Sequence, residues 1–264
     1  MKHQLVSSLV FSSLFVFSGS MAQAALFDYA GLADHQNVPG ITSGLPAAGG
    51  GVGQANVTGG EQGSPAFKWI IDNVNISHSA YQYGNEQISY NPYLDSNDGN
   101  GPAGLGVCQI LGDHTQGNLT DNECKSGSAD DNVTVTEVLQ LTGTDGQILS
   151  IDRIDFRNAI HGIDFNDGGR NTNFYLMIDS GDWNPIALPD GTGFIDFSGS
   201  PLVGNMFKFA AETNFLRVLE VNENQFYIKS LSANAVPIPS AFILFATGLG
   251  ALVGGRYLTN KRRG

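Results

Sequence analysis

Hydrophobic and polar residues alternate with a period of two along the middle of the chain, a pattern that indicates half-buried β-strands. The first such run spans residues 67–76, and the second spans 133–142, where Glu137 interrupts the apolar side. Asp145-Gly146 predicts a tight turn, after which residues 148–156 are expected to return as the partner strand. Further strands are predicted at residues 174–178, 194–197, 207–211, 215–221 and 225–231.

The runs from 148–156 onward are four to nine residues long and are bounded by Gly, Asn, Asp or Pro. No segment keeps an amphipathic helical period over a dozen residues. The pattern therefore predicts an all-β domain at residues 66–235, an antiparallel β-sandwich of jelly-roll or immunoglobulin-like type. Residues 25–65 are rich in Gly, Ala and Pro, and we expect a loosely structured entry segment there, with one short strand near 56–58.

The first 24 residues have the features of a secretory signal peptide. A charged start, Met-Lys-His, precedes a short apolar stretch between Leu5 and Phe17, and small residues follow up to Ala22-Gln23-Ala24. Cleavage after this A-x-A site would leave Ala25 as the first residue of the mature chain. An uncleaved N-terminal membrane helix is the alternative.

The last 29 residues, 236–264, combine three features in a fixed order. The sequence Val-Pro-Ile-Pro at 236–239 is rigid and non-helical, because each proline fixes φ and lacks an N–H donor. The segment 240–258 is mostly apolar and, with 19 residues, is close to the ~20 that a membrane-spanning helix needs. A basic cluster ends the chain and is expected to stay in the cytoplasm.

This order of parts resembles the PEP-CTERM tail that exosortases recognise. The residues that would carry the signal are Val236, Pro237, Pro239, Arg262 and Arg263. The resemblance implies an exosortase-type processing enzyme as a partner, and attachment to the membrane through the C-terminal helix before processing. It also implies export through the inner membrane to the envelope, outer surface or extracellular matrix of a Gram-negative bacterium. Ile238 stands where the family usually has Glu, and a plain transmembrane anchor is the alternative.

A second resemblance covers the stretch from Gly104 to His161. It is similar to the sandwich domains of many PEP-CTERM proteins, in which a Gly-Leu-Gly-Val turn, an acidic turn and two core strands recur. The matching residues are Gly104-Leu105-Gly106-Val107, Asp131-Asn132-Val133, the segments 137–141 and 154–158, and His161. The resemblance implies fold and location rather than activity. Glu137 and His161 then belong either to a site at the loop ends or to a polar network.

The predicted mature domain is strongly acidic. Residues 25–236 hold all 25 acidic side chains and 8 of the 13 basic ones, which gives a formal charge of −17. Such a surface repels nucleic-acid phosphates and anionic lipids, and this argues strongly against both as partners. The same charge attracts divalent cations.

The two cysteines, Cys108 and Cys124, both lie in the exported part, where an even count favours a disulfide. With 15 residues between them, closing this loop would stabilise the fold by roughly 3 kcal/mol in the chain-entropy model. Metal binding by this pair is the weaker alternative, because neither a C-x-x-C motif nor a His at ligand spacing accompanies it.

Acidic loops rich in Gly and Asn are the candidate cofactor sites, because Ca²⁺ takes six to eight oxygen ligands from carboxylates, amides and carbonyls. None of these loops fits the EF-hand spacing, and an ordinary solvated turn is the alternative for each. The candidate Ca²⁺ ligands are Asp95, Asn97, Asp98, Asp130, Asp131, Asp164 and Asp167.

Trp183 lies in the polar, turn-like sequence Gly-Asp-Trp-Asn-Pro and is a candidate for stacking on a sugar ring. A loop anchor folded back onto the core is the alternative. No catalytic set stands out: His78, His114 and His161 are far apart in sequence and outside metal motifs, and no G-x-S-x-G occurs.

The sequence therefore predicts a non-enzymatic surface or matrix protein associated with exopolysaccharide and biofilm. One version of this hypothesis is a Ca²⁺-assisted glycan-binding or adhesive module. The alternative is a secreted hydrolase of matrix polysaccharide.

Overall fold

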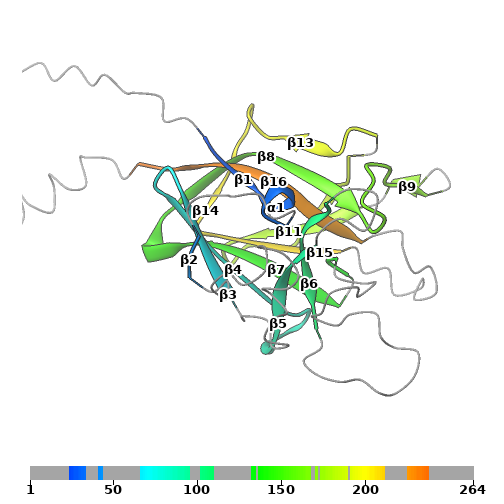
Figure 1. The fold of residues 1–264 in the computed structure, drawn as a ribbon, viewed down its shortest axis with the longest axis horizontal. Helices are drawn as coiled ribbons and strands as arrows, with labels where there is room; N and C mark the ends of the chain where they lie inside the picture. Colours follow the sequence, from blue (N-terminus) through cyan, green and yellow to red (C-terminus); the bar gives the residue numbers. More distant parts are fainter. Residues whose placement is uncertain are drawn as a thin grey trace, which may run out of the picture.

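In the computed structural model the described residues are 24–33, 41–43, 66–95, 102–109, 132–134, 136–167, 170–171, 173–189, 191–211 and 225–237. Strands dominate this part of the chain, and one short helix and one 3₁₀ turn accompany them (Figure 1). The elements are β1 Ala25–Asp28, α1 Tyr29–Ala33, β2 Ile41–Ser43, β3 Ala66–Ile71, β4 Val74–Gln82, β5 Asn85–Asp95, β6 Gly104–Cys108, β7 Glu137–Gly143, η1 Thr144–Gly146, β8 Leu149–Asn158, β9 Asn166–Asp167, β10 Arg170–Asn171, β11 Asn173–Ile178, β12 Asn184–Ala187, β13 Phe194–Asp196, β14 Leu202–Gly204, β15 Met206–Ala211 and β16 Phe226–Ala235.

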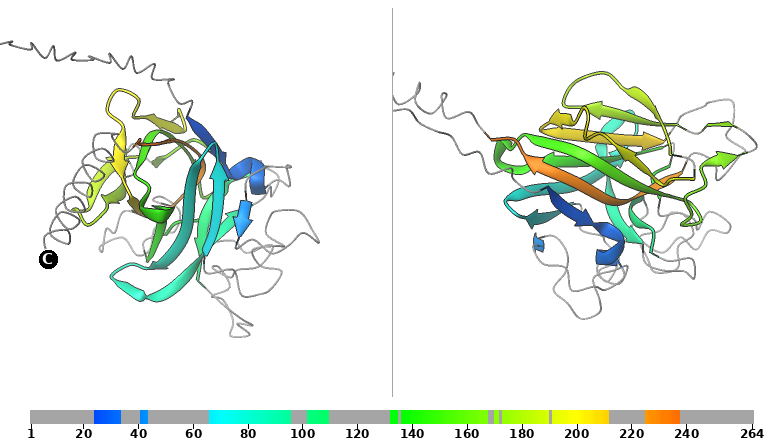
Figure 2. Two further views of the ribbon diagram at one scale, coloured as in Figure 1. Left: turned by 90° about the vertical axis from the view of Figure 1, so that its left-hand side faces the viewer. Right: turned by 90° about the horizontal axis from the view of Figure 1, so that it is seen from above.

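Fourteen of the strands form one antiparallel sheet that curls on itself (Figure 2). Along the main path the strand order is β12-β11-β15-β7-β4-β5-β6-β16-β8-β13. Strand β5 links two halves, because its first part pairs with β4 and its last five residues pair with β6. We call β12, β11, β15, β7, β4, β3 and β2 the β7 half, and β6, β16, β8, β13, β14 and β1 the β8 half.

The inner faces of the two halves pack against each other through aromatic side chains. Phe174 on β11 lies with its ring centre 5.1 Å from that of Phe156 on β8 and 5.7 Å from that of Phe226 on β16. All three rings are fully buried. Burying one such side chain stabilises the fold by roughly 1.5–3 kcal/mol, so these rings hold the curl closed. The prediction of an all-β antiparallel domain is confirmed.

The expectation of a loosely structured entry is wrong for residues 25–33. β1 pairs with β16 along four residues, and α1 follows it directly. The rings of Phe27 and Tyr29 both meet Trp69 of β3 edge-on, at 5.3 and 5.4 Å between ring centres. The sequence analysis grouped these residues with the Gly- and Pro-rich stretch that follows them, and the average composition of 25–65 concealed this short apolar segment.

Two strand assignments from the pattern also need correction. The run 67–76 is a hairpin of β3 and β4, because Asp72 and Asn73 turn the chain with φ of 47° and 68°. The turn at Asp145-Gly146 is confirmed, with φ of 54° and 74°, but β8 is not the partner of β7. β7 pairs with β4 and β15, whereas β8 pairs with β16, β13 and β14. The turn therefore carries the chain from one half of the sheet to the other.

The sequence Gly-Leu-Gly-Val is a buried strand, β6, rather than a turn. Gly104 explains the first glycine: its φ is 120°, and a Cβ there would lie 2.4 Å from the carbonyl oxygen of Ile228. The backbones of β6 and β16 approach each other closely at this point, and only glycine leaves the space.

Several predictions concern residues outside the described part of the chain. They are the signal peptide up to Gln23, the strand at 215–221, the segment 240–258 and the motif residues Pro239, Arg262 and Arg263. Within the described ranges, no helix has the length and apolar character to cross a membrane. The first strand begins at Ala25, next to the predicted cleavage site, and the last ends at Ala235.

His78 is a polar residue in the middle of this core. Its ring stacks on Phe67 at 4.1 Å, its Nδ1 lies 3.2 Å from the carbonyl oxygen of Phe67, and its Nε2 lies 2.8 Å from the Tyr29 hydroxyl. A carbonyl only accepts, so Nδ1 carries the proton and Nε2 accepts from Tyr29. Burial lowers the pKa of His78 from 6.5 to about 3, and the bond to Phe67 partly opposes this shift. The imidazole is neutral in the folded protein.

This burial predicts acid sensitivity. Between pH 6.5 and about 3 the unfolded chain binds a proton at His78 that the folded protein does not, so stability falls as the pH falls through this window. We expect the His78 contribution to cost about 2 kcal/mol between pH 7 and pH 5. Urea titrations at both pH values measure it. The His78→Gln variant keeps hydrogen-bonding atoms but does not titrate, and an equal pH dependence in both proteins would contradict the assignment.

Candidate functional site

An aromatic patch lies on the outer face of the β7 half, separate from the main core. We define the patch as Tyr81, Tyr83, Tyr175 and Trp183. These rings cover a small apolar floor formed by two buried residues, Val138 and Ala210.

The alternation of the strands places these residues outward. On β4, Ala80 belongs to the main core and Tyr81 to the patch, and on β11 Phe174 and Leu176 point inward while Tyr175 points outward. Across the strands, Tyr81 is opposite Val138, and Tyr175 is opposite Ala210. Small floor residues between the tyrosines allow the rings to lie down over the sheet, because a larger side chain there would hold them apart.

Trp183 reaches the patch from the turn between β11 and β12. Its ring centre lies 5.6 Å from that of Tyr83, with the planes tilted by 41°. The turn is held by Asp179, whose Oδ1 accepts hydrogen bonds from the backbone N–H groups of Asn205 and Met206, both at 2.9 Å. Trp183 is thus neither fully solvated nor part of the main core. Its indole is half-buried in the patch.

An ion pair borders the patch. Lys208 Nζ donates a hydrogen bond to Glu86 Oε1 at 2.6 Å and lies 5.4 Å from the centre of the Tyr81 ring. Burial alone would lower the pKa of Lys208, but its contacts with Glu86 and Tyr81 outweigh burial and raise it. The same hydrogen bond from Lys208 lowers the pKa of Glu86, and burial raises that of Tyr81. Both members of the pair are therefore charged at neutral pH.

Uncharged polar side chains continue the outer face beyond the patch. Ser77 is opposite Thr142, and Ser79 is opposite Gln140, which in turn is opposite Lys208. Gln140 Nε2 donates to Thr142 Oγ1 at 3.2 Å, and all four uncharged residues are partly exposed. The face therefore offers flat aromatic surface beside hydroxyl and amide groups, a combination that can stack on a ring and hydrogen-bond its substituents.

Three of the candidate Ca²⁺ ligands, Asp95, Asp164 and Asp167, lie in the described part of the chain. Asp95 Oδ2 lies 2.9 Å from Nε2 of His161, and both side chains are almost completely buried. Asp164 is exposed, and its backbone oxygen accepts a 2.6 Å hydrogen bond from Asn158 Nδ2. Asp167 forms part of β9. In the described ranges, no group of three His, Cys, Asp or Glu residues could hold a metal ion. The remaining candidates, Asn97, Asp98, Asp130 and Asp131, lie outside those ranges.

Glu137 belongs to a buried polar network. Its carboxylate accepts from the backbone N–H of Thr134 and from Nε2 of Gln109, both at 2.8 Å. His161 likewise has Asp95 as a partner and meets the ring of Tyr227 edge-on at 5.5 Å. These contacts fit the network alternative for both residues.

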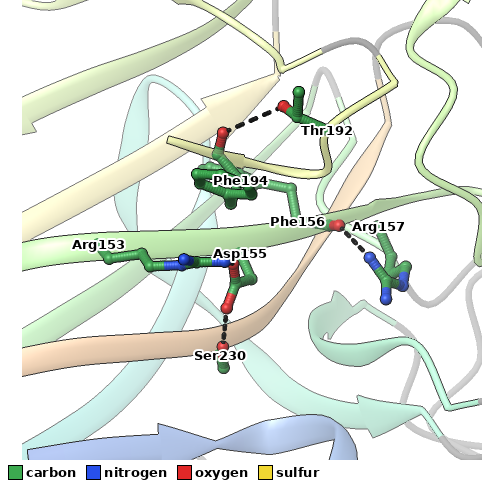
Figure 3. A network of polar contacts seen from close by, with 7 residues as sticks. All are labelled: Arg153, Asp155, Phe156, Arg157, Thr192, Phe194 and Ser230. Carbon is green, nitrogen blue, oxygen red and sulfur yellow. Dashed lines mark hydrogen bonds and ion pairs between the residues drawn. The ribbon is translucent and has the colours of Figure 1, made fainter. Parts of the chain in front are cut away.

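A second polar cluster lies on the outer face of the β8 half and was not anticipated from the sequence (Figure 3). Arg153 binds Oδ1 of Asp155 through Nε at 2.9 Å and NH2 at 2.8 Å, and it stacks over Phe194 at 3.8 Å from the ring centre. The other carboxylate oxygen of Asp155 accepts from Ser230. Period-two alternation predicts that Arg153 and Asp155 share a face, but the contacts with β13 and β16 depend on long-range pairing. The cluster fastens β13 to β8.

The first residue of the predicted sorting motif is attached to the sheet. The backbone N–H of Val236 donates to the carbonyl oxygen of Ile148 at 2.9 Å, and its side chain is partly exposed. Pro237 follows as the last described residue and is exposed. The motif therefore begins directly where β16 ends.

Cys108 ends β6 and is fully buried. It is not a free thiol. Its predicted partner, Cys124, lies outside the described residues, so the pairing stays a prediction.

Comparison with known proteins adds little to this picture. No protein-family model matches the sequence, and no curated protein matches it. Among solved structures, the chain is similar to wild-type discoidin II from Dictyostelium discoideum, with 9% sequence identity and a TM-score of 0.26. The match covers 64% of this chain and 56% of discoidin II, so the chain spans little more than half of that protein. A similarity of this size supports no conclusion about fold or function.

The two tryptophans should differ sharply in solvent access. Trp69 is fully buried between Phe27 and Tyr29, whereas Trp183 is partly exposed in the patch. We expect acrylamide to quench the fluorescence of a Trp69→Phe variant, which keeps only Trp183, several times more strongly than that of a Trp183→Phe variant. The emission of the Trp183→Phe variant should also lie further to the blue. Equal quenching of the two variants would contradict the placement of Trp183.

Proposed function

We propose that this chain is an exported, non-enzymatic surface or matrix protein whose β domain binds glycan through the aromatic patch. The observation that carries the proposal is the position of Trp183 and Tyr83: their rings meet on the outer face of the sheet, outside the main core. Aromatic residues that serve only the fold are expected in the core, where their burial contributes most.

The chemistry of this face suits a sugar. A pyranose ring presents C–H groups that pack on an aromatic face, and its hydroxyl groups then need donors and acceptors beside that face. Ser79, Gln140 and Thr142 supply both within the neighbouring strands. The patch alone is too small for a stable protein–protein interface, which buries on the order of 800 Å² on each partner. A polymer with repeating units can instead use the patch and the polar rows together.

The order of segments supports an extracellular location. The strands of the domain occupy residues 25–235, the interval between the predicted signal peptide and the predicted sorting tail. The formal charge of −17 is consistent with a soluble domain outside the cell. The motif 236–239 adjoins the end of β16, where a processing enzyme would meet it.

For the fold we propose the jelly-roll type among the two sandwiches that the pattern predicts. The path of the chain supports this choice. One half contains β6, β8 and β16, and the other contains β7, β11 and β15. The chain therefore passes repeatedly from one half to the other. Such alternation is typical of jelly rolls.

Polysaccharide binding tests the function directly. In affinity electrophoresis against a panel of soluble polysaccharides, we expect the purified domain to be retarded by at least one polymer. We expect Trp183→Ala to weaken that binding by about tenfold, because stacking on an aromatic side chain is lost.

The matched control is Phe194→Ala, which removes an aromatic ring from the outer face of the other half. Equal effects of the two substitutions, or no retardation by any polymer, would contradict the proposal. Running the gels with Ca²⁺ and with EDTA tests the Ca²⁺-assisted version, which requires that EDTA abolish binding.

Mass spectrometry of the protein from its native envelope tests the sorting tail. We expect the mature chain to begin at Ala25 and to end near residues 236–239, without Arg262 and Arg263. An Ile238→Glu variant, which restores the usual residue of the motif, should be processed at least as completely. A full-length C-terminus in a strain with an active exosortase would overturn the assignment.

A further inference from the structure

The charges around the aromatic patch point to the class of glycan that it takes. We propose that the patch selects uncharged glycans, and that Glu86 determines this specificity by occupying Lys208. The inference rests on the proposed glycan-binding function and adds its ligand class.

Among the described residues, Lys208 is the cation that adjoins the patch. Its ammonium group lies near the Tyr81 ring and would be the natural partner for the carboxylate of a uronic acid. Lys68 lies on the same face, but it is opposite Ser77, four residues along β4 from Tyr81. At about 3.3 Å per residue, that separation is roughly 13 Å. Recognition of an acidic sugar at the patch therefore depends on Lys208.

The ammonium group of Lys208 is already bound from the solvent side. Glu86 Oε1 lies 2.6 Å from Nζ, and the Glu86 side chain is 66% exposed whereas that of Lys208 is 9% exposed. An approaching carboxylate would meet the negative charge of Glu86 before it reached Lys208. To bind, it would have to replace Glu86, a partner that is tethered on β5 of the same sheet and is therefore present at high effective concentration.

A second acidic side chain beside the patch, that of Asp182, also repels an approaching carboxylate. Asp182 precedes Trp183 and is exposed. The formal charge of −17 on the predicted mature domain adds a long-range repulsion of acidic polymers. Neutral hydroxyl groups are not subject to either effect, and Ser79 and Gln140 remain to bind them.

The test compares neutral and acidic polymers on the folded domain. The probes are a set of neutral glucans, mannans and galactans, and a set of polyuronates, alginate and polygalacturonate, at low salt. We expect the unchanged protein to bind at least one neutral polymer more tightly than either polyuronate. In Glu86→Gln the ammonium group is released, and we expect polyuronate binding to increase about tenfold or more and to weaken again as NaCl is added.

Two control variants isolate the cause. Glu86→Gln combined with Lys208→Met should lose the gain, because the ammonium group that the first substitution releases is then removed. Asp145→Asn changes the net charge by the same amount at an exposed turn on the end of the sheet, and Asn tolerates its positive φ. This variant should bind polyuronates no better than the unchanged protein. Matching melting temperatures confirm that each variant is folded.

The outcomes separate the two proposals. If the protein binds no polymer of either class, the proposed function fails. If it binds polyuronates best and Trp183→Ala abolishes that binding, the glycan function stands and the present inference is wrong. The inference is also wrong if Glu86→Gln gains no polyuronate binding, or if Asp145→Asn gains as much.

Discussion

The contact of Phe174 with Phe156 and Phe226 is the interaction on which the rest of the structure depends. Phe174 comes from β11, whereas Phe156 and Phe226 come from the adjacent strands β8 and β16, which are far from β11 along the strand order of the sheet. Without this contact and the buried core that surrounds it, the fourteen strands would form an open sheet with two wet faces. With it, each half has an inner face that is dry and an outer face that is available for other roles. Because the inner faces of the two halves bury each other, the rings of the aromatic patch remain on an outer face.

Polar groups in the interior impose a second constraint. His78, Glu137 and the pair of Asp95 and His161 are buried, and each is satisfied by named partners. An isolated charge in such surroundings would be strongly unfavourable. These residues therefore require their strands to meet in one register, because a shift would leave them without partners. Their contribution is to specificity of the fold more than to its net stability.

The sequence predicted what depends on neighbouring residues. Alternation located β3, β7, β8, β11 and β15, and the turn at Asp145-Gly146 was recognised from its residue types. The sequence pattern did not reveal which strands pair. β7 and β8 follow each other along the chain and were expected to pair, yet they lie in different halves of the sheet. Gly104 was predicted to be part of a turn. The sequence does not show that the carbonyl oxygen of Ile228 lies only 2.4 Å from where a Cβ of residue 104 would be. Trp183 was singled out by its polar surroundings. Tyr81, Tyr83 and Tyr175 were not, because only the folded strands bring them to Trp183.

The bond between Val236 and Ile148 fixes how the domain would carry a mechanical load. Asn75, near this end of β4, is six residues from Tyr81, so the patch lies roughly 20 Å from the exit of the chain. If the tail is held at a surface while a polymer pulls on the patch, β16 is drawn along its own axis. Its ladders with β8 and β1 would then be sheared as a set, with many hydrogen bonds resisting together, instead of being opened one by one. Under the proposed function, β16 would then transmit tension between the anchored tail and the bound polymer.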